Sequence, residues 1–263
     1  MLKSEPQAGR GHLQCLNRLG GGTMEHQADI LIRRLECIGP VSQQDRDALA
    51  ALPMQKCEVW RGQDLRQEGE DPAECLLVLS GLLSSYKVFP DGRKQITGFH
   101  VPGDIADLQT LFLMPVDFSL AAHSHSVVGA IKHSDLRPLL RNLPLLADLF
   151  WRDSLIEAST YRTWVGAAGT LTAAEHLAHI ICELYARLRA VGLAGNNEVA
   201  LPLTQAELAD TLGVSSISAS RALQELIRHQ LIEMVDEQVR ILDYGSLRAF
   251  GQFDFTYLHL QEA

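Results

Sequence analysis

The sequence is most informative in residues 203–235, which read LTQAELADTLGVSSISASRALQELIRHQLIEMV. Thr204, followed three residues later by Glu207, forms a capping box that opens a helix. Gly213 stands where this helix must turn, because glycine adopts left-handed backbone geometry at little cost. Ser215 is a suitable N-cap for a second helix. The stretch therefore predicts two helices joined by a tight glycine turn.

The second of these helices has two faces of different character. Its apolar face places small and branched residues at helical spacing, namely Ala219, Ala222, Leu223 and Leu226. Its other face is polar and carries the candidate DNA-contacting residues Ser216, Ile217, Ser218, Ser220, Arg221 and Gln224, with Arg228 further along. Arg221 can donate two parallel hydrogen bonds to guanine or hold a phosphate. The pattern predicts a helix-turn-helix, with packing or protein contacts as the alternative use of such a hairpin.

The run EMVDEQVRIL at residues 233–242 predicts a small hairpin beside these helices, a wing.

The net charge of this part of the chain sets a condition on DNA binding. From Leu171 onward the chain has six arginines and no lysine against twelve acidic residues, and most DNA-binding domains are basic. Binding therefore requires that Arg221, Arg228 and Arg240 gather on one face while the carboxylates lie elsewhere.

Composition describes an ordinary globular protein. The chain has 263 residues, 46% of them hydrophobic and 21% charged, which suits one large domain or two smaller ones. No apolar run approaches the roughly 18 residues of a membrane span, and no secretory signal is visible. Five cysteines, an odd number, indicate a reducing cytoplasm. The net charge of -9 argues against coating nucleic acid by bulk charge.

The chain divides into five segments. We expect a mobile tail at residues 1–28, a β-rich domain at 29–142, a long helix at 143–168, the helix-turn-helix domain at 169–247 and an extension at 248–263. The β-rich domain begins with two short helices, the second capped by Ser42, and ends with a helix capped by Ser134. Between them, short apolar runs alternate with turn signals and predict an antiparallel sandwich or barrel; the runs are Leu76–Leu79, Leu82–Phe89, Gln95–Val101 and Ser119–Ile131. Pro90-Asp91-Gly92 predicts a hairpin turn.

The helix that begins at Pro144 carries more apolar surface than one covering layer needs. Leu149 and Ile156 are seven residues apart, the spacing of a coiled-coil seam, and Thr160 continues it. We therefore expect Leu149, Ile156 and Thr160 to pair two copies of the helix about a two-fold axis. The sequence GAAGT at residues 166–170 is expected to break the helix.

These motifs together resemble the Crp/Fnr superfamily of bacterial transcription regulators, over residues 29–242. The resemblance rests on the helix-turn-helix and on the turns Glu68-Gly69-Glu70, Gly81 and Pro102-Gly103-Asp104. The stretch GRKQITGFHVPGDIADL, residues 92–108, looks most like FixK-type members. The resemblance implies an α+β fold, with a cyclic-nucleotide-binding-type β-roll (a jelly roll), a dimerisation helix and a C-terminal winged helix-turn-helix.

The same resemblance implies a homodimer that binds a palindromic operator in double-stranded DNA, with RNA polymerase as a further partner. The family's base-contacting positions fall on Ser216, Ile217, Ser220 and Arg221. Many relatives have glutamate at the position of Ile217, so their half-site preference does not transfer. Effector binding in the roll would shift the two recognition helices.

The effector is not identified by the sequence. Cyclic-nucleotide binders grip phosphate with an Arg-Ser or Arg-Thr pair, and this chain has Asp117-Phe118-Ser119 there, so cyclic AMP is not expected to bind. Iron–sulfur ligation is not expected either, because the cysteines form no CxxC pair; they are Cys15, Cys37, Cys57, Cys75 and Cys182. A haem on His100, or a metal on His123 and His125 from one strand face, remains open.

The rival hypothesis is a small-molecule, metal or haem sensor, or a cupin-like enzyme, whose helix-turn-helix serves protein contacts. Cupin metal sites need a glutamate after the His-x-His pair, and none stands at a matching offset here. No nucleophilic triad, phosphate-binding loop or paired-carboxylate signature is present. The sequence therefore predicts a regulator that is not an enzyme and uses no cofactor or metal.

Overall fold

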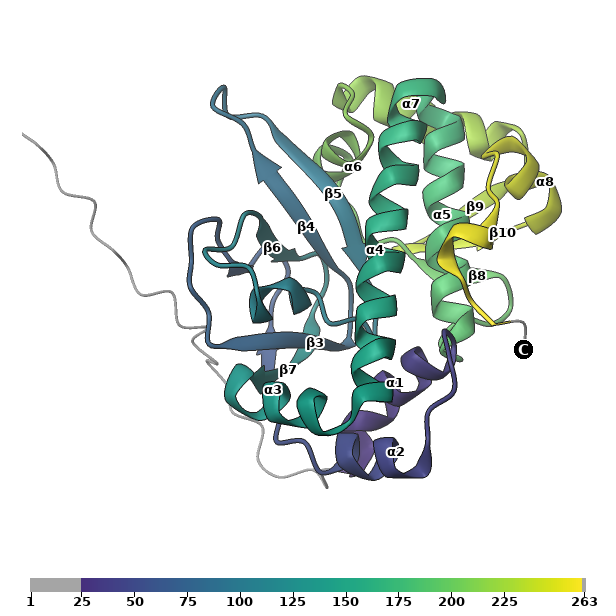
Figure 1. The fold of residues 1–263 in the computed structure, drawn as a ribbon. Helices are drawn as coiled ribbons and strands as arrows, with labels where there is room; N and C mark the ends of the chain where they lie inside the picture. The colour runs from purple at the N-terminus through teal and green to yellow at the C-terminus, as the bar shows by residue number, and fades with distance from the viewer. Residues whose placement is uncertain (1–24, 262–263) are drawn as a thin grey trace, which may run out of the picture.

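Two β-sheets, a long helix and a smaller helical domain make up the protein, and Figure 1 shows their arrangement. The computed structural model describes residues 25–261. The elements in chain order are α1 (Glu25–Glu36), α2 (Gln43–Ala50), β1 (Gln55–Val59), β2 (Asp64–Arg66), β3 (Glu74–Ser80), β4 (Leu83–Val88), β5 (Lys94–His100), η1 (Leu108–Leu111), β6 (Ser119–Ala122), β7 (Ser126–Lys132), α3 (His133–Asn142), α4 (Pro144–Thr170), α5 (Ala173–Ala190), β8 (Glu198–Ala200), α6 (Gln205–Leu212), α7 (Ser216–Arg228), β9 (Ile232–Val235), β10 (Gln238–Ile241), α8 (Tyr244–Phe250) and η2 (Phe255–Leu258).

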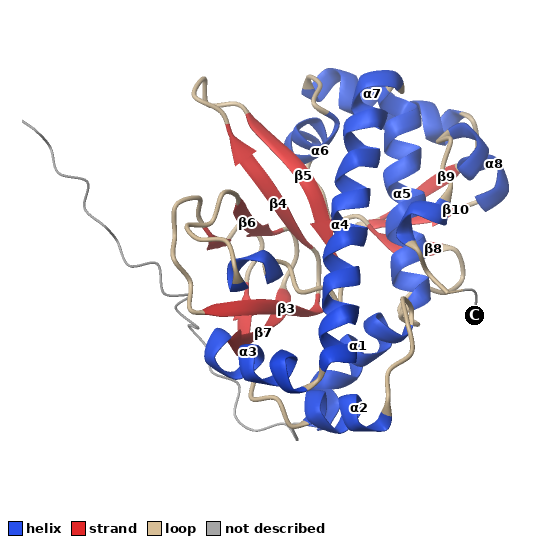
Figure 2. Ribbon diagram, viewed as in Figure 1, coloured by secondary structure: helices blue, strands red, loops and turns tan. Residues whose placement is uncertain are grey.

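The expected antiparallel β-domain is present. One sheet has the order β1-β7-β3 and the other β2-β6-β4-β5, and every pairing is antiparallel. The hairpin at Pro90-Asp91-Gly92 is confirmed: the Phe89 N–H donates to the Arg93 carbonyl at 2.9 Å, and Gly92 has φ 83°. The run expected at Ser119–Ile131 is two strands, β6 and β7, separated by a turn. Figure 2 shows the β4–β5 hairpin extending from the roll to α6.

The helices flanking the roll differ slightly from the expectation. Helix α1 already begins at Glu25, inside the segment expected as a tail, while residues 1–24 lie outside the described part. The capping box of α2, between Ser42 and Asp45, is confirmed. Ser134, in contrast, is not a cap: α3 starts at His133, with Lys132 in the N-cap position.

Helix α4 does not break at GAAGT but continues through it to Thr170. Gly166 and Gly169 are exposed, and each weakens a helix by about 1 kcal/mol relative to alanine. On the opposite side Trp164 and Ala167 are only 5% and 6% exposed. Burial of this side outweighs the local preference of the glycines, so the helix continues to Thr170 and ends at its C-cap, Leu171.

The two domains share one of the three hydrophobic clusters. One cluster fills the interior of the roll, and another packs α1, α2, α3 and the first half of α4 on the outside of β3. The third runs from Tyr86 and Phe99 of the roll to Ile181 of α5 and Leu226 of α7. The helix-turn-helix domain is therefore packed on the roll through apolar side chains. None of the helices between Glu25 and Gln261 is both long and apolar enough to cross a membrane.

The segment after α8, residues 251–261, returns along the molecule to α1, as the yellow end of the ribbon in Figure 1 shows. Phe253 and Leu258 are 4% and 2% exposed. The Tyr257 hydroxyl donates to Glu183 Oε2 at 2.7 Å, and the Gln261 N–H donates to the Cys37 carbonyl at 2.7 Å. We call residues 251–261 the C-terminal segment; it connects the DNA-binding domain to the N-terminal helices.

Gly251 gives a test of this packing. A Cβ atom there would lie 2.6 Å from the His179 backbone nitrogen, so Gly251→Ala must displace the C-terminal segment from α5. We expect the free energy of unfolding to fall by about 1–3 kcal/mol in urea titrations. The matched change Gly245→Ala, whose Cβ meets only Asp243 Oδ1 at 3.4 Å, should change it by about 0.5 kcal/mol or less. Equal stability of the two variants would contradict the packing described here.

Candidate DNA-binding site

Short-range capping fixes the two helices of the candidate site. The Thr204 N–H donates to Glu207 Oε2 at 2.7 Å and the Glu207 N–H donates to Thr204 Oγ1 at 3.2 Å, which confirms the capping box of α6. Gly213 ends α6 with φ 68°, the left-handed conformation expected of it. Ser215 caps α7 by accepting the Ser218 N–H at 3.2 Å. The helix-turn-helix is thus specified by residues within one turn of each helix end.

Helix α7 buries one face and presents the other to solvent. Ala219, Ala222 and Leu226 are at most 3% exposed. On the outer face Ile217 is 67% exposed, and Arg221 is exposed as well. Of the other candidates, Ser216 and Gln224 are exposed, while Ser218 and Ser220 are partly buried. The Ser218 hydroxyl lies 3.0 Å from that of Ser215, so this side chain takes part in the cap.

The charges near α7 are unevenly distributed. Arg221 and Arg228 both lie on its exposed side, and within residues 25–261 neither joins an ion pair. Arg240 is different, because on β10 it pairs with Glu198 at 3.0 Å and Glu233 at 3.2 Å. Two of the three arginines that the sequence singled out therefore remain available to an anionic partner, and the third pairs with carboxylates of β8 and β9.

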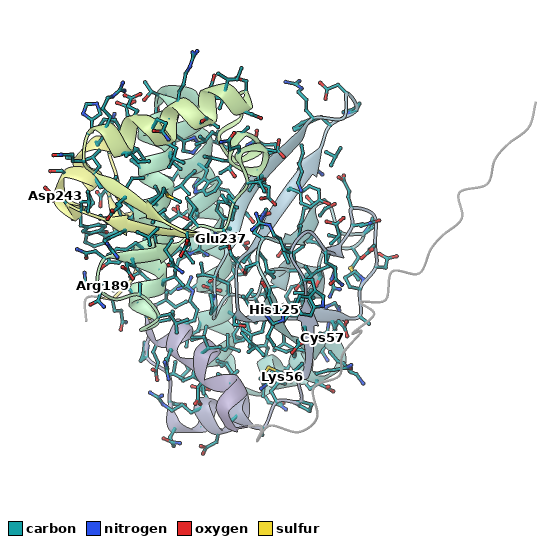
Figure 3. All side chains as sticks on the ribbon, turned by 180° about the vertical axis from the view of Figure 1, so that it is seen from behind. Lys56, Cys57, His125, Arg189, Glu237 and Asp243 are labelled. Atoms are coloured by element: carbon teal, nitrogen blue, oxygen red, sulfur yellow. The ribbon has the colours of Figure 1, made fainter. Side chains whose placement is uncertain are left out.

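The DNA-binding domain contacts the roll through Glu207 of α6. Glu207 Oε1 lies 2.9 Å from Nδ1 of the buried His123, whose Nε2 lies 2.7 Å from the Ser84 hydroxyl. Arg61 donates to Glu207 Oε2 at 3.1 Å and to Glu237, in the turn of the wing, at 3.1 Å. Figure 3 shows Glu237 where the wing meets the roll. We call this set the roll–α6 contact.

The protonation state of the roll–α6 contact follows from burial. Burial lowers the pKa of His123 despite the neighbouring Glu207 carboxylate, so the imidazole is neutral at neutral pH. Burial alone would raise the pKa of Glu207, but hydrogen bonds from Thr204 and His123 hold it below its usual range. His123 Nδ1–H therefore donates to a carboxylate, which leaves Nε2 to accept from Ser84.

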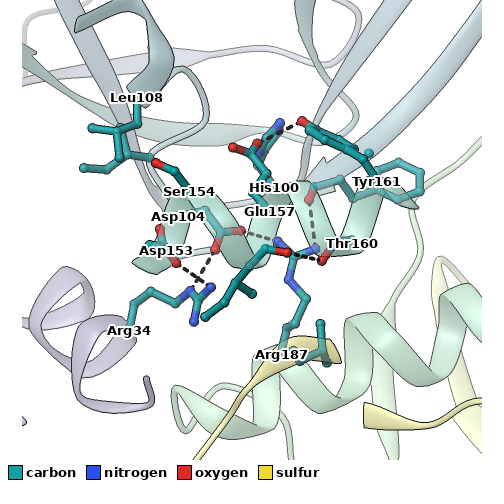
Figure 4. A pocket seen from close by; sticks show the side chains of 15 residues that line it. Arg34, His100, Asp104, Leu108, Asp153, Ser154, Glu157, Thr160, Tyr161 and Arg187 are labelled. Atoms are coloured by element: carbon teal, nitrogen blue, oxygen red, sulfur yellow. Dashed lines mark hydrogen bonds and ion pairs between the residues drawn. The ribbon is translucent and has the colours of Figure 1, made fainter. Parts of the chain in front are cut away.

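A second polar cluster joins α1, the roll, α4 and α5, and Figure 4 shows Arg34, Asp104, Asp153 and Arg187 of it from close by. Asp104 accepts from Arg34 at 3.2 Å and from Arg187 at 2.6 Å. Arg34 also pairs with Asp153 at 2.6 Å, and Arg187 pairs with Glu183 at 3.2 Å. Burial would raise the pKa of Asp104, yet the two guanidiniums hold it below its usual range. We call these five residues the Asp104 cluster.

Two further titratable groups border a small cavity beside this cluster. The Tyr161 hydroxyl donates to Glu157 at 2.8 Å, and burial raises the pKa of Glu157 to about 7. His100 Nε2 lies 2.6 Å from the Ser85 hydroxyl, and burial lowers the pKa of His100 to about 4. The cavity holds about 40 Å³, room for little more than one water molecule. His100 is thus a neutral, hydrogen-bonded core residue.

The two histidines that the sequence offers as metal ligands do not converge. His123 is 1% exposed and points inward, whereas the His125 side chain is 48% exposed and lies against Trp60, so the expectation that the two share a strand face is wrong. The turn that splits β6 from β7 separates them. Within the described residues no three His, Cys, Asp or Glu side chains group as metal ligands do. Cys182 is fully buried, as expected, and Cys15 lies outside the described residues.

Two cations in the described part of the roll lie close to acidic side chains. Arg66 is 1% exposed and pairs with Asp107 at 2.9 Å. Lys87 donates to Glu68 at 2.8 Å and also to the carbonyl of Asp117. Both cations are therefore already paired with carboxylates.

Comparison with known proteins identifies the family of this chain. Residues 57–142 match the cyclic nucleotide-binding domain family, and residues 175–250 match the Crp-like helix-turn-helix domain family. The chain is 28% identical over 211 residues to the transcriptional activator protein FnrA of Stutzerimonas stutzeri, covering 80% of this chain and 86% of FnrA. The chain belongs to the Crp/Fnr family of transcription regulators.

Other members of the Crp/Fnr family agree with this placement. The nitrogen fixation regulation protein FixK of Bradyrhizobium diazoefficiens is 28% identical over 174 residues, covering 66% of this chain and 72% of FixK. The solved structure of FixK2 from Bradyrhizobium japonicum superposes with a TM-score of 0.67 at 26% identity, covering 76% of this chain and 98% of that one. The Crp-like domain match ends at residue 250, so the C-terminal segment lies beyond it.

Sequence reasoning missed the residues that join the two domains. Arg61 and His123 lie 146 and 84 residues from Glu207, and Arg34 and Arg187 lie 70 and 83 residues from Asp104. Glu207 was recognised only as a capping residue. The contact of Glu207 with the roll has no local sequence signal. The capping-box sequence is the same whether or not the glutamate carboxylate also contacts another domain.

Arg221 gives the direct test of the recognition face. Arg221→Ala removes an exposed guanidinium without touching the core, so folding should be unchanged. If the side chain contacts a guanine edge, operator binding should weaken by about 1–3 kcal/mol per half-site, with specificity relaxed at one base pair. Titrations against the selected operator and its single-base variants at two salt concentrations measure this.

The control for this experiment is Arg46→Ala, which removes an arginine from α2 on the far side of the molecule. It should bind the operator as the wild type does. A uniform loss across sequences together with a smaller salt slope would assign Arg221 to phosphate instead. Wild-type affinity of Arg221→Ala on every sequence would show that the side chain does not face DNA.

Glu157 gives a test by pH. Its pKa is about 7 in the folded protein against an ordinary value of 4.5, so the folded state keeps a proton that the unfolded state releases in this interval. Through this group the free energy of unfolding falls as pH rises from 4.5 to about 7. Glu157→Gln cannot ionise, so its stability relative to the wild type should rise across that window. A constant difference in urea titrations would refute the raised pKa.

Proposed function

We propose that the protein is a sequence-specific regulator that binds a palindromic operator as a homodimer. The observation that carries the proposal is the exposed face of α7, where Arg221 projects while the opposite face is buried. Membership of the Crp/Fnr family supports a role in transcription. RNA polymerase as a partner and the cytoplasm as the location follow from the family resemblance.

The acidic domain suits selective rather than general DNA binding. Several carboxylates are engaged in hydrogen bonds or ion pairs away from the outer face of α7: Glu198 and Glu233 with Arg240, and Glu207 with the roll. Arg221 and Arg228 then supply a small positive surface within an otherwise negative domain. Few phosphate contacts mean weak non-specific affinity, so discrimination must come from contacts to bases.

The dimer contact expected from the sequence needs correction. Leu149, Ile156 and Thr160 are between 4% and 8% exposed, because this side of α4 packs on its own chain. A second stripe, Trp151, Leu155 and Val165, lies on the opposite side of the helix and is between 51% and 75% exposed. Large apolar side chains left exposed in a row mark an interaction surface. The proposed homodimer therefore pairs α4 through Trp151, Leu155 and Val165.

The operator can be identified by selecting, from a pool of DNA fragments, those that the purified protein binds. A palindromic site is expected, because a two-fold dimer presents two copies of α7. Enrichment of single, non-palindromic half-sites would contradict the dimer, and no enrichment would contradict sequence-specific binding altogether.

The dimer contact has its own matched test. Leu155→Asp places a charge in the proposed interface, so light scattering should report monomers and operator affinity should fall at least tenfold, which is about 1.4 kcal/mol. Leu145→Asp is the control: Leu145 is 73% exposed on the same helix but points away from the stripe. A dimer that survives Leu155→Asp, or is lost equally with Leu145→Asp, would place the interface elsewhere.

A further inference from the structure

Ile217 is a large apolar side chain on the otherwise polar outer face of α7. It is 67% exposed, more than any other large apolar side chain between Leu171 and Gln261. This exposure forgoes the stabilisation that burial of its methyl and methylene groups would give. Ile217 is also the second residue of α7, within the N-terminal part that contacts base edges when a recognition helix enters the major groove. The side chain therefore lies where the proposed regulator meets DNA.

The buried side of α7 fixes the orientation of Ile217. Ala219, Ala222 and Leu226 pack against the rest of the domain and are at most 3% exposed. Leu226 lies about two and a half turns after Ile217, so the two side chains are on opposite sides of the helix. Arg221 lies about one turn after Ile217 and shares its face. Ile217 therefore cannot turn inward unless the buried residues leave the core.

The chemistry of this part of α7 limits what Ile217 can recognise. A hydrocarbon side chain neither donates nor accepts hydrogen bonds, so it cannot distinguish bases by the polar atoms on their edges. No acidic residue occurs between Ser216 and Gln224, so no carboxylate there can accept from the amino group of cytosine. The neighbouring Ser218 hydroxyl takes part in the cap with Ser215. The apolar group that the major groove offers to such a side chain is the C5-methyl of thymine.

We propose that Ile217 contacts the C5-methyl group of a pyrimidine in the major groove of each operator half-site. The proposal deepens the sequence-specific binding proposed above and rests on it. It assigns thymine or 5-methylcytosine to this position, because the same methyl group projects from both bases. Four residues of helix rise about 6 Å and stacked base pairs are about 3.4 Å apart, so this pyrimidine lies about two base pairs from the contact of Arg221.

The test changes only the methyl group of the DNA. Each thymine of the selected operator is replaced in turn by deoxyuridine, which lacks the methyl group and keeps every hydrogen-bonding atom. At one symmetry-related pair of positions, wild-type affinity should fall about fourfold per half-site, the effect of losing contact with one methyl group. Cytosine and 5-methylcytosine at the same positions form a second matched pair, and the methylated operator should bind more tightly by a similar factor.

Two variants assign the contact to a side chain. Ile217→Ala should fold normally, since Ile217 lies outside the hydrophobic clusters, and it should bind the two members of each pair equally at the mapped position. Leu193→Ala is the matched control, because Leu193 is 50% exposed but follows α5, at the end of the molecule where Cys37 contacts Ala190. This variant should keep the wild-type preference for the methylated base. All titrations are made at one salt concentration.

Two results would overturn the proposal. One is equal affinity of the wild type for both members of each pair at every position of the operator. The other is a methyl preference that persists in Ile217→Ala, or that Leu193→Ala loses as well, which would assign the effect to another part of the chain. In both cases the wild type still binds its operator, so the proposed function stands. The absence of any selected operator would instead contradict the proposed function and this inference together.

Discussion

Asp104 accepts hydrogen bonds from two largely buried guanidiniums that reach it from opposite directions, Arg34 on α1 and Arg187 on α5. Its second oxygen also accepts the Val101 N–H at 2.7 Å, which fixes the loop after β5. Charges held away from water are stable only when each has its partner in place. The relative positions of α1, the roll and α5 therefore depend on one carboxylate, and a change in any of the three elements would leave a buried charge uncompensated.

The roll–α6 contact holds α6, the helix that follows α5 in the DNA-binding domain. Arg187 belongs to α5 and Glu207 to α6, so the roll holds both helices that precede α7 through polar groups. Apolar packing between Phe99, Trp164 and Ile181 adds a non-directional component to the same interface. Rotation of the DNA-binding domain would require the polar contacts to break together, which favours two discrete arrangements over a continuous range.

Local features of this fold could be predicted and distant ones could not. The caps at Ser42, Thr204 and Ser215 depend on atoms within one helical turn, so a few neighbouring residues determine each of them. Helix α4 shows the limit, since it carries two apolar stripes with similar spacing. The stripe at Leu149 and Ile156 looked like a partner contact because periodicity reports burial but not which chain provides it.

The Asp104 cluster and the roll–α6 contact could not be predicted from the sequence for a related reason. The sequence around Asp104 predicts only a turn, and nothing near it indicates that two arginines 70 and 83 residues away converge on this carboxylate. His123 and His125 were grouped because an extended strand would place them on one face. The turn between β6 and β7 breaks that alternation, so one side chain enters the core and the other remains in solvent.

The return of the C-terminal segment to α1 has a consequence for synthesis on the ribosome. Residues 251–261 emerge after both of the domains that they connect, and domains generally fold in the order in which they leave the ribosome. Helix α7 is therefore complete before the Gln261 N–H can reach the Cys37 carbonyl. During this interval the nascent chain has a formed recognition helix whose domain is not yet held from the C-terminal side, so its final orientation is set only after the Gln261 N–H has paired with the Cys37 carbonyl.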